Sequence, residues 1–165
     1  MQQEQQGHGQ MSERMMRHHY MMLGVNLLLS LIIMYVAMFA MIWSGNAFIQ
    51  NLNFFYMALV MWAPMAIVMM LTMSMMYKNR TLNMILYAAF ALVFLLSFWA
   101  IRQQGLVGDK QFVRSMIPHH SGAILMCNRA SIRDAEVREL CFKPNGIVDS
   151  QTREIEQMNR ILERL

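Results

Sequence analysis

Two adjacent histidines, His119 and His120, follow Pro118 in the stretch MIPHHSGAILMC, which runs from Met116 to Cys127. At about 100° per residue along a helix, the side chains with sulfur or imidazole donor atoms share one arc of about 120°. The arc holds Met116, His119, His120, Met126 and Cys127, with the small residue Ala123 near its centre. Thioether and thiolate sulfur favour Cu(I), whereas imidazole also binds Cu(II) and zinc. The stretch therefore predicts a copper site, or a silver site by the same softness.

Pro118 bears on how these donors are aimed. Because proline has no N–H, the carbonyl of Arg114 loses its helical partner and the helix is expected to bend just before the histidines. Proline in a first helical turn is also common, and adjacent histidines on a helix often have only a structural or surface role. A zinc site would require a closed set of four Cys, His or carboxylate ligands, which this helix alone does not offer. Copper fits the mixture of donors better.

No catalytic constellation accompanies the histidines. Two imidazoles could act as general acid and base, but no serine or cysteine nucleophile has an evident base and an orienting carboxylate. The sequence also lacks the Glu-x-x-His pair of the di-iron carboxylate proteins. We therefore predict that the protein is not an enzyme. The alternative to metal binding is a structural membrane protein whose C-terminal helices bind a protein partner without metal.

The composition indicates a membrane protein. Of the 165 residues, 56% are hydrophobic, and the 21 methionines outnumber the leucines; the mean hydropathy is +0.30. The net charge of +4 arises from basic residues scattered among acidic ones, so the sequence has no nucleic-acid-binding patch. The two cysteines have neither C-x-x-C nor zinc-ribbon spacing, and they could form one bridge, act as ligands or be inert.

Three runs without charged residues are long enough to cross a bilayer as helices, which takes about 20 residues. They cover residues 23–43, 55–77 and 82–101. The second contains Pro64, which neighbouring helices can tolerate in a membrane. The runs predict three transmembrane helices.

The distribution of Lys and Arg predicts the orientation of these helices, because both residues prefer the cytoplasmic side. Arg14 and Arg17 precede the first run, and Lys78 and Arg80 separate the second from the third. The connection between the first two runs has no basic residue. We therefore expect a cytoplasmic N-terminus, with the C-terminal segment on the opposite side of the membrane.

Polar segments flank the three runs. Residues 1–22 form a Gln-rich tail that is too poor in branched aliphatic residues to build a core. Its MMRHHYMM run, Met15–Met22, and His8 farther out are either a tail that captures soft metal ions or a membrane-flanking segment with incidental histidines. Residues 102–165 are charged and amphipathic, and they predict a helical hairpin or small bundle that needs a metal, a partner or a second copy for stability.

Methionine also recurs every four residues in the second predicted transmembrane helix. The series is Met57, Met61, Met65, Met69 and Met73. It spans about 24 Å of helix, and such a ladder could carry Cu(I) across the membrane. Methionine is also a pliant apolar packer, and a stripe of this spacing drifts around the helix. Packing is the better interpretation.

The stretch FVRSMIPHHSGAILMC, followed by DAEVRELC and SQTREIEQM, resembles a bacterial family called domain of unknown function 305. This is a ferritin-like helical group that includes copper-binding proteins of the CopM type. The resemblance covers roughly residues 109–165, and the M-I-P-H-H core is its specific part. It implies a periplasmic or membrane-attached protein that binds Cu(I), Cu(II) or Ag(I) and serves metal tolerance. With the expected orientation, this places the protein in a bacterial inner membrane with its C-terminal domain in the periplasm. The ligands that it implies by position are Met116, His119, His120, Met126 and, from the last helix, Met158.

The chain departs from the family pattern at residues 142–146, where FKPNG separates the Leu-Cys and Ser-Gln segments. Pro-Asn-Gly is a strong turn signal, and a turn there could shift Met158 relative to the histidines. The sequence thus predicts an all-α protein, with three transmembrane helices in residues 23–101 and a helical copper-binding domain in residues 102–165. Cys127 would strengthen the copper site only if it is reduced.

Overall fold

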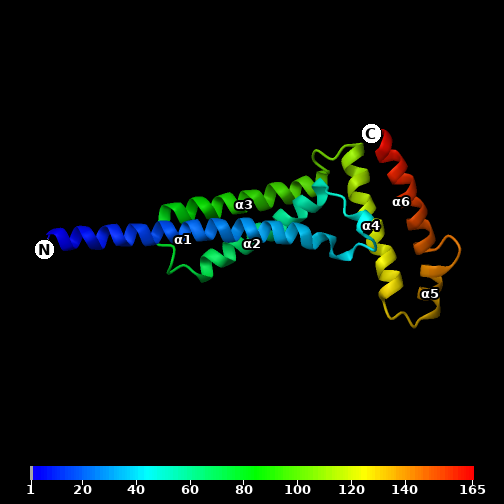
Figure 1. The fold of residues 1–165 in the computed structure, drawn as a ribbon, viewed down its shortest axis with the longest axis horizontal. Helices are drawn as coiled ribbons and strands as arrows, with labels where there is room; N and C mark the ends of the chain where they lie inside the picture. The colour runs from blue at the N-terminus through cyan, green and yellow to red at the C-terminus, as the bar shows by residue number, and fades with distance from the viewer. Residues whose placement is uncertain (1) are drawn as a thin grey trace. The chain divides into compact units, whose positions relative to one another are not determined.

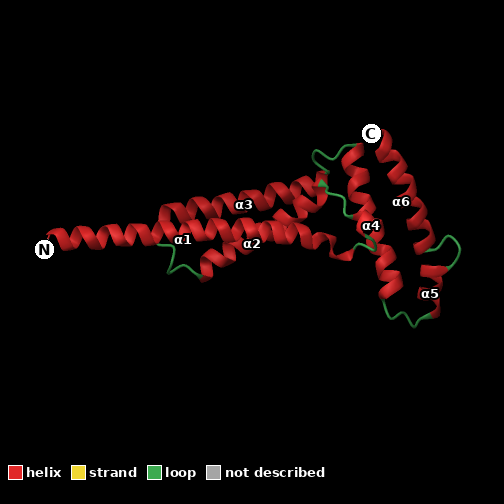
Figure 2. Cartoon of the chain, in the orientation of Figure 1, coloured by secondary structure: helices red, strands yellow, loops and turns green. Residues whose placement is uncertain are grey.

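The computed structural model of this chain describes the backbone from Gln2 to Leu165 and the side chains from Arg14 onward. Every regular element in this part of the chain is a helix (Figures 1 and 2). In order they are α1 (Gln2–Ala37), the 3-10 turns η1 (Met38–Met41) and η2 (Gly45–Ala47), α2 (Leu52–Thr72), α3 (Arg80–Gln103), α4 (Asp109–Arg129), α5 (Ala135–Phe142) and α6 (Ile147–Arg164). The all-α prediction is confirmed. His8, for which the sequence left metal capture and an incidental role open, lies outside the described side chains.

Three of the helices are long and apolar enough to cross a membrane. They are Arg14–Met41, Leu52–Thr72 and Arg80–Gln103. The second ends five residues before the predicted boundary at Tyr77, because the backbone N–H of Met76 donates to the carbonyl of Met73 (2.9 Å) and forms a turn. Asn79 then caps α3, since the N–H of Leu82 donates to its side-chain oxygen at 3.0 Å. The turn is as apolar as the helix before it, so hydropathy did not reveal this end.

The chain forms two compact units, which we call the membrane unit (Met1–Met34 and Met57–Trp99) and the C-terminal unit (Tyr35–Tyr56 and Ala100–Leu165). In the membrane unit, α1, α2 and α3 pack around one apolar core. Its buried members are Leu23, Leu27, Ala63, Ala66, Met70, Tyr77 and Phe90. The small alanines let helices approach closely, as is usual between transmembrane helices. The indole N–H of Trp62 donates to the carbonyl of Leu27 (2.7 Å) and joins α2 to α1.

The methionine ladder of α2 changes its surroundings along the helix. Met65 and Met69 pack against the core of the membrane unit, whereas Met57, Met61 and Met73 are exposed. The drift of a four-residue stripe around the helix explains this difference. The five thioethers therefore do not follow one path through the core, and their arrangement favours the packing interpretation.

In the C-terminal unit, α4 and α6 run side by side in opposite directions, with the short α5 between them in sequence (Figure 1). Val113 and Ile117 of α4 are buried together with Ala47 of η2. The apolar face of α6 packs against them through Ile155, Met158, Ile161 and Leu162. Antiparallel packing of two amphipathic helices therefore supplies most of the core of this unit.

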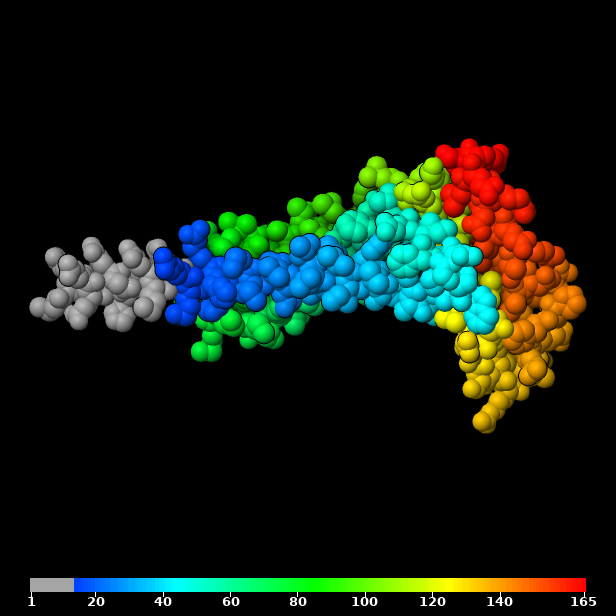
Figure 3. All heavy atoms as spheres, in the orientation of Figure 1, coloured from blue at the N-terminus to red at the C-terminus, as the bar shows by residue number. Residues whose placement is uncertain are grey.

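The connection between α1 and α2 belongs to this unit. The N–H of Trp43 donates to Ser121 Oγ at 2.7 Å, and Asn53 donates to Ser115 Oγ at 3.1 Å. Gly122 allows a close approach, since a Cβ there would lie 3.4 Å from the carbonyl oxygen of Met41. In the space-filling view this connection, in cyan, lies against α6, in orange (Figure 3). This role could not be predicted from the sequence, because the connection carries no charge and no regular apolar pattern.

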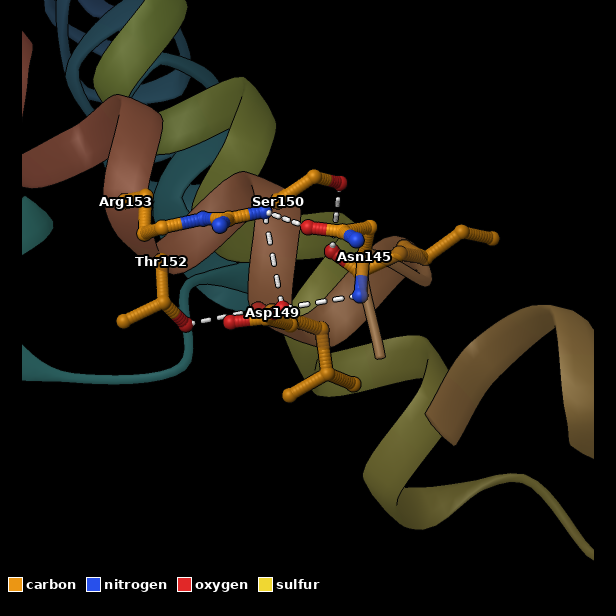
Figure 4. A network of polar contacts seen from close by, with 7 residues as sticks. Asn145, Asp149, Ser150, Thr152 and Arg153 are labelled. Atoms are coloured by element: carbon orange, nitrogen blue, oxygen red, sulfur yellow. Dashed lines mark hydrogen bonds and ion pairs between the residues drawn. The ribbon is translucent and has the colours of Figure 1, made fainter. Parts of the chain in front are cut away.

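The Pro-Asn-Gly sequence forms the turn that separates α5 from α6, as predicted. Asn145 adopts a left-handed conformation with φ of 61°. Figure 4 shows the polar contacts that hold this turn to the first residues of α6. Asp149 accepts from the N–H of Asn145 at 2.9 Å, and Arg153 donates to the side-chain oxygen of Asn145 at 2.6 Å.

We predict that Gly146→Ala destabilises the C-terminal unit by about 1–3 kcal/mol, the usual cost of overpacking. A Cβ at residue 146 would lie 2.8 Å from the carbonyl oxygens of Leu140 and Lys143. Hydrogen exchange of the α4 and α6 amides in the full chain measures this loss. The matched control is Gly108→Ala, which also changes an N-cap glycine but has nothing within 4 Å of the new Cβ. Equal effects of the two substitutions would contradict the steric explanation.

Candidate metal site

Helix α4 carries all the predicted donors except Met158. The helix runs through Pro118, which is buried inside it. Its apolar side contacts α6, and the small residues Ser115 and Gly122 are buried on its other side. The predicted donors occupy the remaining arc, at the edge of the interface with α6.

The donors differ in exposure across this arc. His119 is exposed, and Met126 is 51% exposed. Met116 and His120 are half-buried, whereas Cys127 is buried at 6% exposure. One edge of the arc therefore faces solvent and the other faces the protein, so an ion could reach His119 and Met126 directly.

The two histidines lie next to each other with their ring centroids 6.2 Å apart. Glu154 of α6 places a carboxylate oxygen 3.0 Å from Nδ1 of His120. The contact lacks the alignment of a hydrogen bond, and Nδ1 is a buried atom without a hydrogen-bond partner in the described part of the chain. The position of Glu154 beside His120 does not follow from the sequence, because Glu154 lies on another helix and only the α4–α6 packing brings it to His120.

His120 favours its neutral form. Burial lowers the pKa of His120 below its ordinary value of 6.5, and the nearby His119 lowers it further, while Glu154 partly opposes both. A metal ligates neutral imidazole, so metal binding at a charged histidine must first release a proton. The burial of His120 reduces that requirement near pH 7.

Cys127 forms a disulfide with Cys141 of α5, with the two Cα atoms 5.7 Å apart. A disulfide sulfur has no thiolate to offer a metal. The condition attached to the predicted role of Cys127, a reduced thiol, is thus not met, and the disulfide removes Cys127 from the donor set. Its position on the arc could not reveal this, because Cys141 follows only after the chain has turned back.

Met158 lies in the interface between α4 and α6, where it packs against the buried Val113 and Ile117. Among the described residues, no three His, Cys, Asp or Glu side chains gather into a group that could hold a metal ion. The donors left on the arc are two imidazoles, from His119 and His120, and two thioethers, from Met116 and Met126.

A hollow of about 340 Å³ lies within the C-terminal unit, away from this arc. Its lining includes Trp43, Ser121, Ile124, Asn128, Thr152 and Asn159. Aliphatic and amide groups dominate the wall, and neither histidine of α4 contributes to it. The hollow therefore adds no donor to the predicted site.

Comparison with known proteins places the C-terminal segment in a family. The family model described as "Domain of unknown function (DUF305)" matches residues 97–163. An uncharacterised protein, L153, of Acanthamoeba polyphaga mimivirus is 35% identical over 117 residues, which cover 68% of this chain and 72% of the viral protein. The chain belongs to the DUF305 family. No solved structure matches it.

The similarity to the viral protein extends beyond the family segment at residues 97–163. The alignment with the viral protein covers 68% of this chain, whereas residues 97–165 make up less than half of it. The similarity therefore continues into the apolar helices that precede the family segment.

We expect reduction of the Cys127–Cys141 disulfide to destabilise the C-terminal unit by about 3 kcal/mol, the entropic value for a closed loop of about 15 residues. Hydrogen exchange of the α4 amides with and without reductant measures the change. The double variant Cys127→Ser with Cys141→Ser should match the reduced protein and show no response to reductant. Full stability in both would contradict the assigned bridge.

We also expect the metal-free C-terminal unit to lose stability as the pH falls from 6.5 toward the lowered pKa of His120. The unfolded chain binds a proton in this window while the folded chain does not, so protonation favours unfolding. Hydrogen exchange as a function of pH, with chelator present, measures the slope. His120→Asn should flatten the slope, whereas His119→Asn, at the exposed neighbouring position, should largely retain it. An unchanged slope in His120→Asn would assign the pH dependence to another group.

Proposed function

We propose that this DUF305 protein binds copper as Cu(I) at the surface of α4 and thereby serves copper tolerance or homeostasis. The observation that carries the proposal is the pair of histidines at the edge of the α4–α6 interface, with two methionines on the same arc. Each of the four side chains supplies a neutral donor atom. The copper ion is the cargo of this site, and the protein performs no chemical conversion on it.

The donor chemistry supports copper, and Cu(I) in particular. Thioethers select Cu(I), and imidazole binds both copper states. Silver, as Ag(I), has the same soft character and should compete for the site. Cu(II) would depend on His119 and His120 alone, since thioether sulfur contributes little to it.

Each residue has a distinct role in this proposal. Burial favours the neutral form of His120 by lowering its pKa, and a carboxylate oxygen of Glu154 lies 3.0 Å from its Nδ1. His119 is exposed and would contact an arriving ion first. Met116 lies one turn before the histidine pair and Met126 about two turns after it on the same helix. Because ten residues of helix span about 15 Å, the two thioethers would serve as alternative sulfur donors on either side of the histidines. Met158 and Cys127 are left out, because one is packed in the core and the other is bridged.

The membrane attachment supports a site outside the cytoplasm. If α1, α2 and α3 each cross the membrane, two crossings separate the α1–α2 connection from the C-terminal helices, so both lie on the same side. The hydrogen bond between Trp43 of the connection and Ser121 of α4 agrees with this. Disulfides persist in oxidising compartments, and α4 carries one. Arg14 and Arg17 favour a cytoplasmic N-terminus. We therefore propose that the copper site faces the periplasm or an equivalent extracytoplasmic space.

Partner binding is the second candidate function, and one observation favours it. Val137, Leu140 and Phe142 of α5 are exposed at 45%, 52% and 48%, although apolar side chains on a short helix are usually covered. A partner-binding module should keep the stability of α4 and α6 when metal is removed, whereas a copper site should stabilise these helices when loaded.

The deciding experiment is an anaerobic Cu(I) titration of the full chain against a competing chelator. We expect His119→Ala with His120→Ala to weaken the site on α4 by more than about 100-fold, the upper range for loss of supporting residues around a metal. Met116→Leu with Met126→Leu should weaken Cu(I) binding and leave Cu(II) binding nearly unchanged. Acidification below about pH 6.5 should release the ion as the imidazoles protonate.

The matched control for this titration is Met158→Leu, which replaces a packed methionine with a residue of similar volume. We expect its Cu(I) affinity at the α4 site to stay within about twofold of the natural chain. Unchanged Cu(I) binding in the double histidine variant would disprove the proposed site, and the partner-binding function would then be favoured.

A further inference from the structure

The membrane unit has imidazole and thioether donors of its own, which the site on α4 does not use. They lie on α1 before its apolar run and on the turn between α2 and α3, which lies beside α1 (Figure 1). The residues concerned are Met15, Met16, His18, His19, Met21 and Met22 of α1, with Met73, Met75 and Met76 of the turn. The sequence left open whether the α1 group binds metal or merely flanks the membrane.

The contact between His19 and the turn fixes the tautomer of one imidazole. Nδ1 of His19 lies 3.3 Å from the carbonyl oxygen of Met76. A carbonyl oxygen can only accept a hydrogen bond, so the proton belongs on Nδ1. The neutral ring then has its lone pair on Nε2. Metal-binding histidines usually show this arrangement, in which one ring nitrogen donates to a carbonyl and the other binds the ion.

The turn that supplies this carbonyl is itself held against α1. The hydroxyl of Tyr20 donates to the side-chain oxygen of Asn83 at 2.7 Å, and Asn83 donates to the carbonyl of Tyr77 at 2.7 Å. The rings of Tyr20 and Tyr77 pack with their centroids 5.4 Å apart. Bonds on both sides of the turn therefore position the Met76 carbonyl, and a well-held supporting group is what an ordered metal ligand requires.

Two methionines share the helical face of His19. Met15 precedes it by four residues and Met22 follows it by three, which are the spacings of neighbours on one side of a helix. Met15 is 54% exposed and Met22 is 51% exposed. In contrast, the adjacent Leu23 is 4% exposed and belongs to the core. The two thioethers are thus free of a packing role in this unit and accessible to an ion.

We propose that Nε2 of His19, with the thioethers of Met15 and Met22, forms a second binding site for a monovalent soft ion, Cu(I) or Ag(I). The backbone carbonyl of Met76 contacts His19, and the Met76 side chain is 41% exposed, but the proposed site does not require its thioether. One imidazole with thioethers selects a soft ion. The positive charges of Arg14 and Arg17 on the same helix oppose a divalent ion more strongly than a monovalent one.

This second site does not rest on the function proposed for α4, because none of its residues belongs to the C-terminal unit. With the N-terminus in the cytoplasm, the two sites would lie on opposite sides of the membrane. The protein would then bind soft metal ions on both sides, which a simple membrane anchor for a periplasmic module would not do.

The test uses the full chain in detergent micelles with the α4 site removed by His119→Ala and His120→Ala. Anaerobic Cu(I) titration against a competing chelator, repeated with Ag(I), measures the remaining affinity. In this background we expect one site, and His19→Asn should weaken it by more than about 100-fold. Asparagine can still donate from the position of Nδ1 to the Met76 carbonyl, but it has no atom at Nε2. The variant thus separates ligation from the hydrogen bond that holds the turn.

His18→Asn is the matched control, because His18 is exposed and lies about 100° around the helix from His19. It should bind Cu(I) as the background does. Met15→Leu with Met22→Leu conserves apolar volume and retains His19, so weaker binding in this variant identifies the thioethers even if His19→Asn folds poorly.

Three results would overturn the second site. They are absence of Cu(I) binding in the background, an equal loss in His18→Asn and His19→Asn, or full binding in the double methionine variant. The same titration of His19→Asn in the otherwise natural chain leaves the α4 site intact. Failure of one site is therefore distinguishable from failure of the other.

Discussion

The packing of α6 against α4 is the interaction on which the rest of the C-terminal unit depends. It buries Val113 and Ile117 of α4 against the apolar face of α6, so it decides which side of α4 remains open. The donors lie at the edge of this buried stripe, neither in the core nor on the opposite face. The same packing brings Glu154 to His120, and the chain reversal that it requires brings Cys141 to Cys127.

Burial and bridging give chemically different properties to residues that look alike in sequence. His119 and His120 are adjacent, yet one is exposed and the other is half-buried with its pKa lowered mainly by burial. Met126 is exposed, whereas Met158 packs in the interface. Desolvation acts on each side chain through its neighbours in space, so two identical residues can differ in charge state and in access to an ion.

The membrane unit shows the same principle with a backbone group in place of a carboxylate. A carbonyl of the α2–α3 turn lies at His19 and settles which ring nitrogen carries the proton. The turn exists because α2 ends at Thr72 and Asn79 caps α3. A local feature of the backbone, where one helix stops, thus controls the chemistry of a side chain more than fifty positions earlier in the chain.

The sequence by itself determined the helical class, the three apolar helices and the Pro-Asn-Gly turn, because helical periodicity, hydropathy and turn residues act over short distances. It also placed the histidines and methionines of α4 on one arc, which follows from helix geometry alone. Only the tertiary structure decided that Cys127 is bridged, that Met158 is packed, that Glu154 accompanies His120, and that the α1–α2 connection joins the C-terminal unit. Each of these depends on contacts between residues far apart in the chain, where many pairings are compatible with the same local pattern and packing selects one.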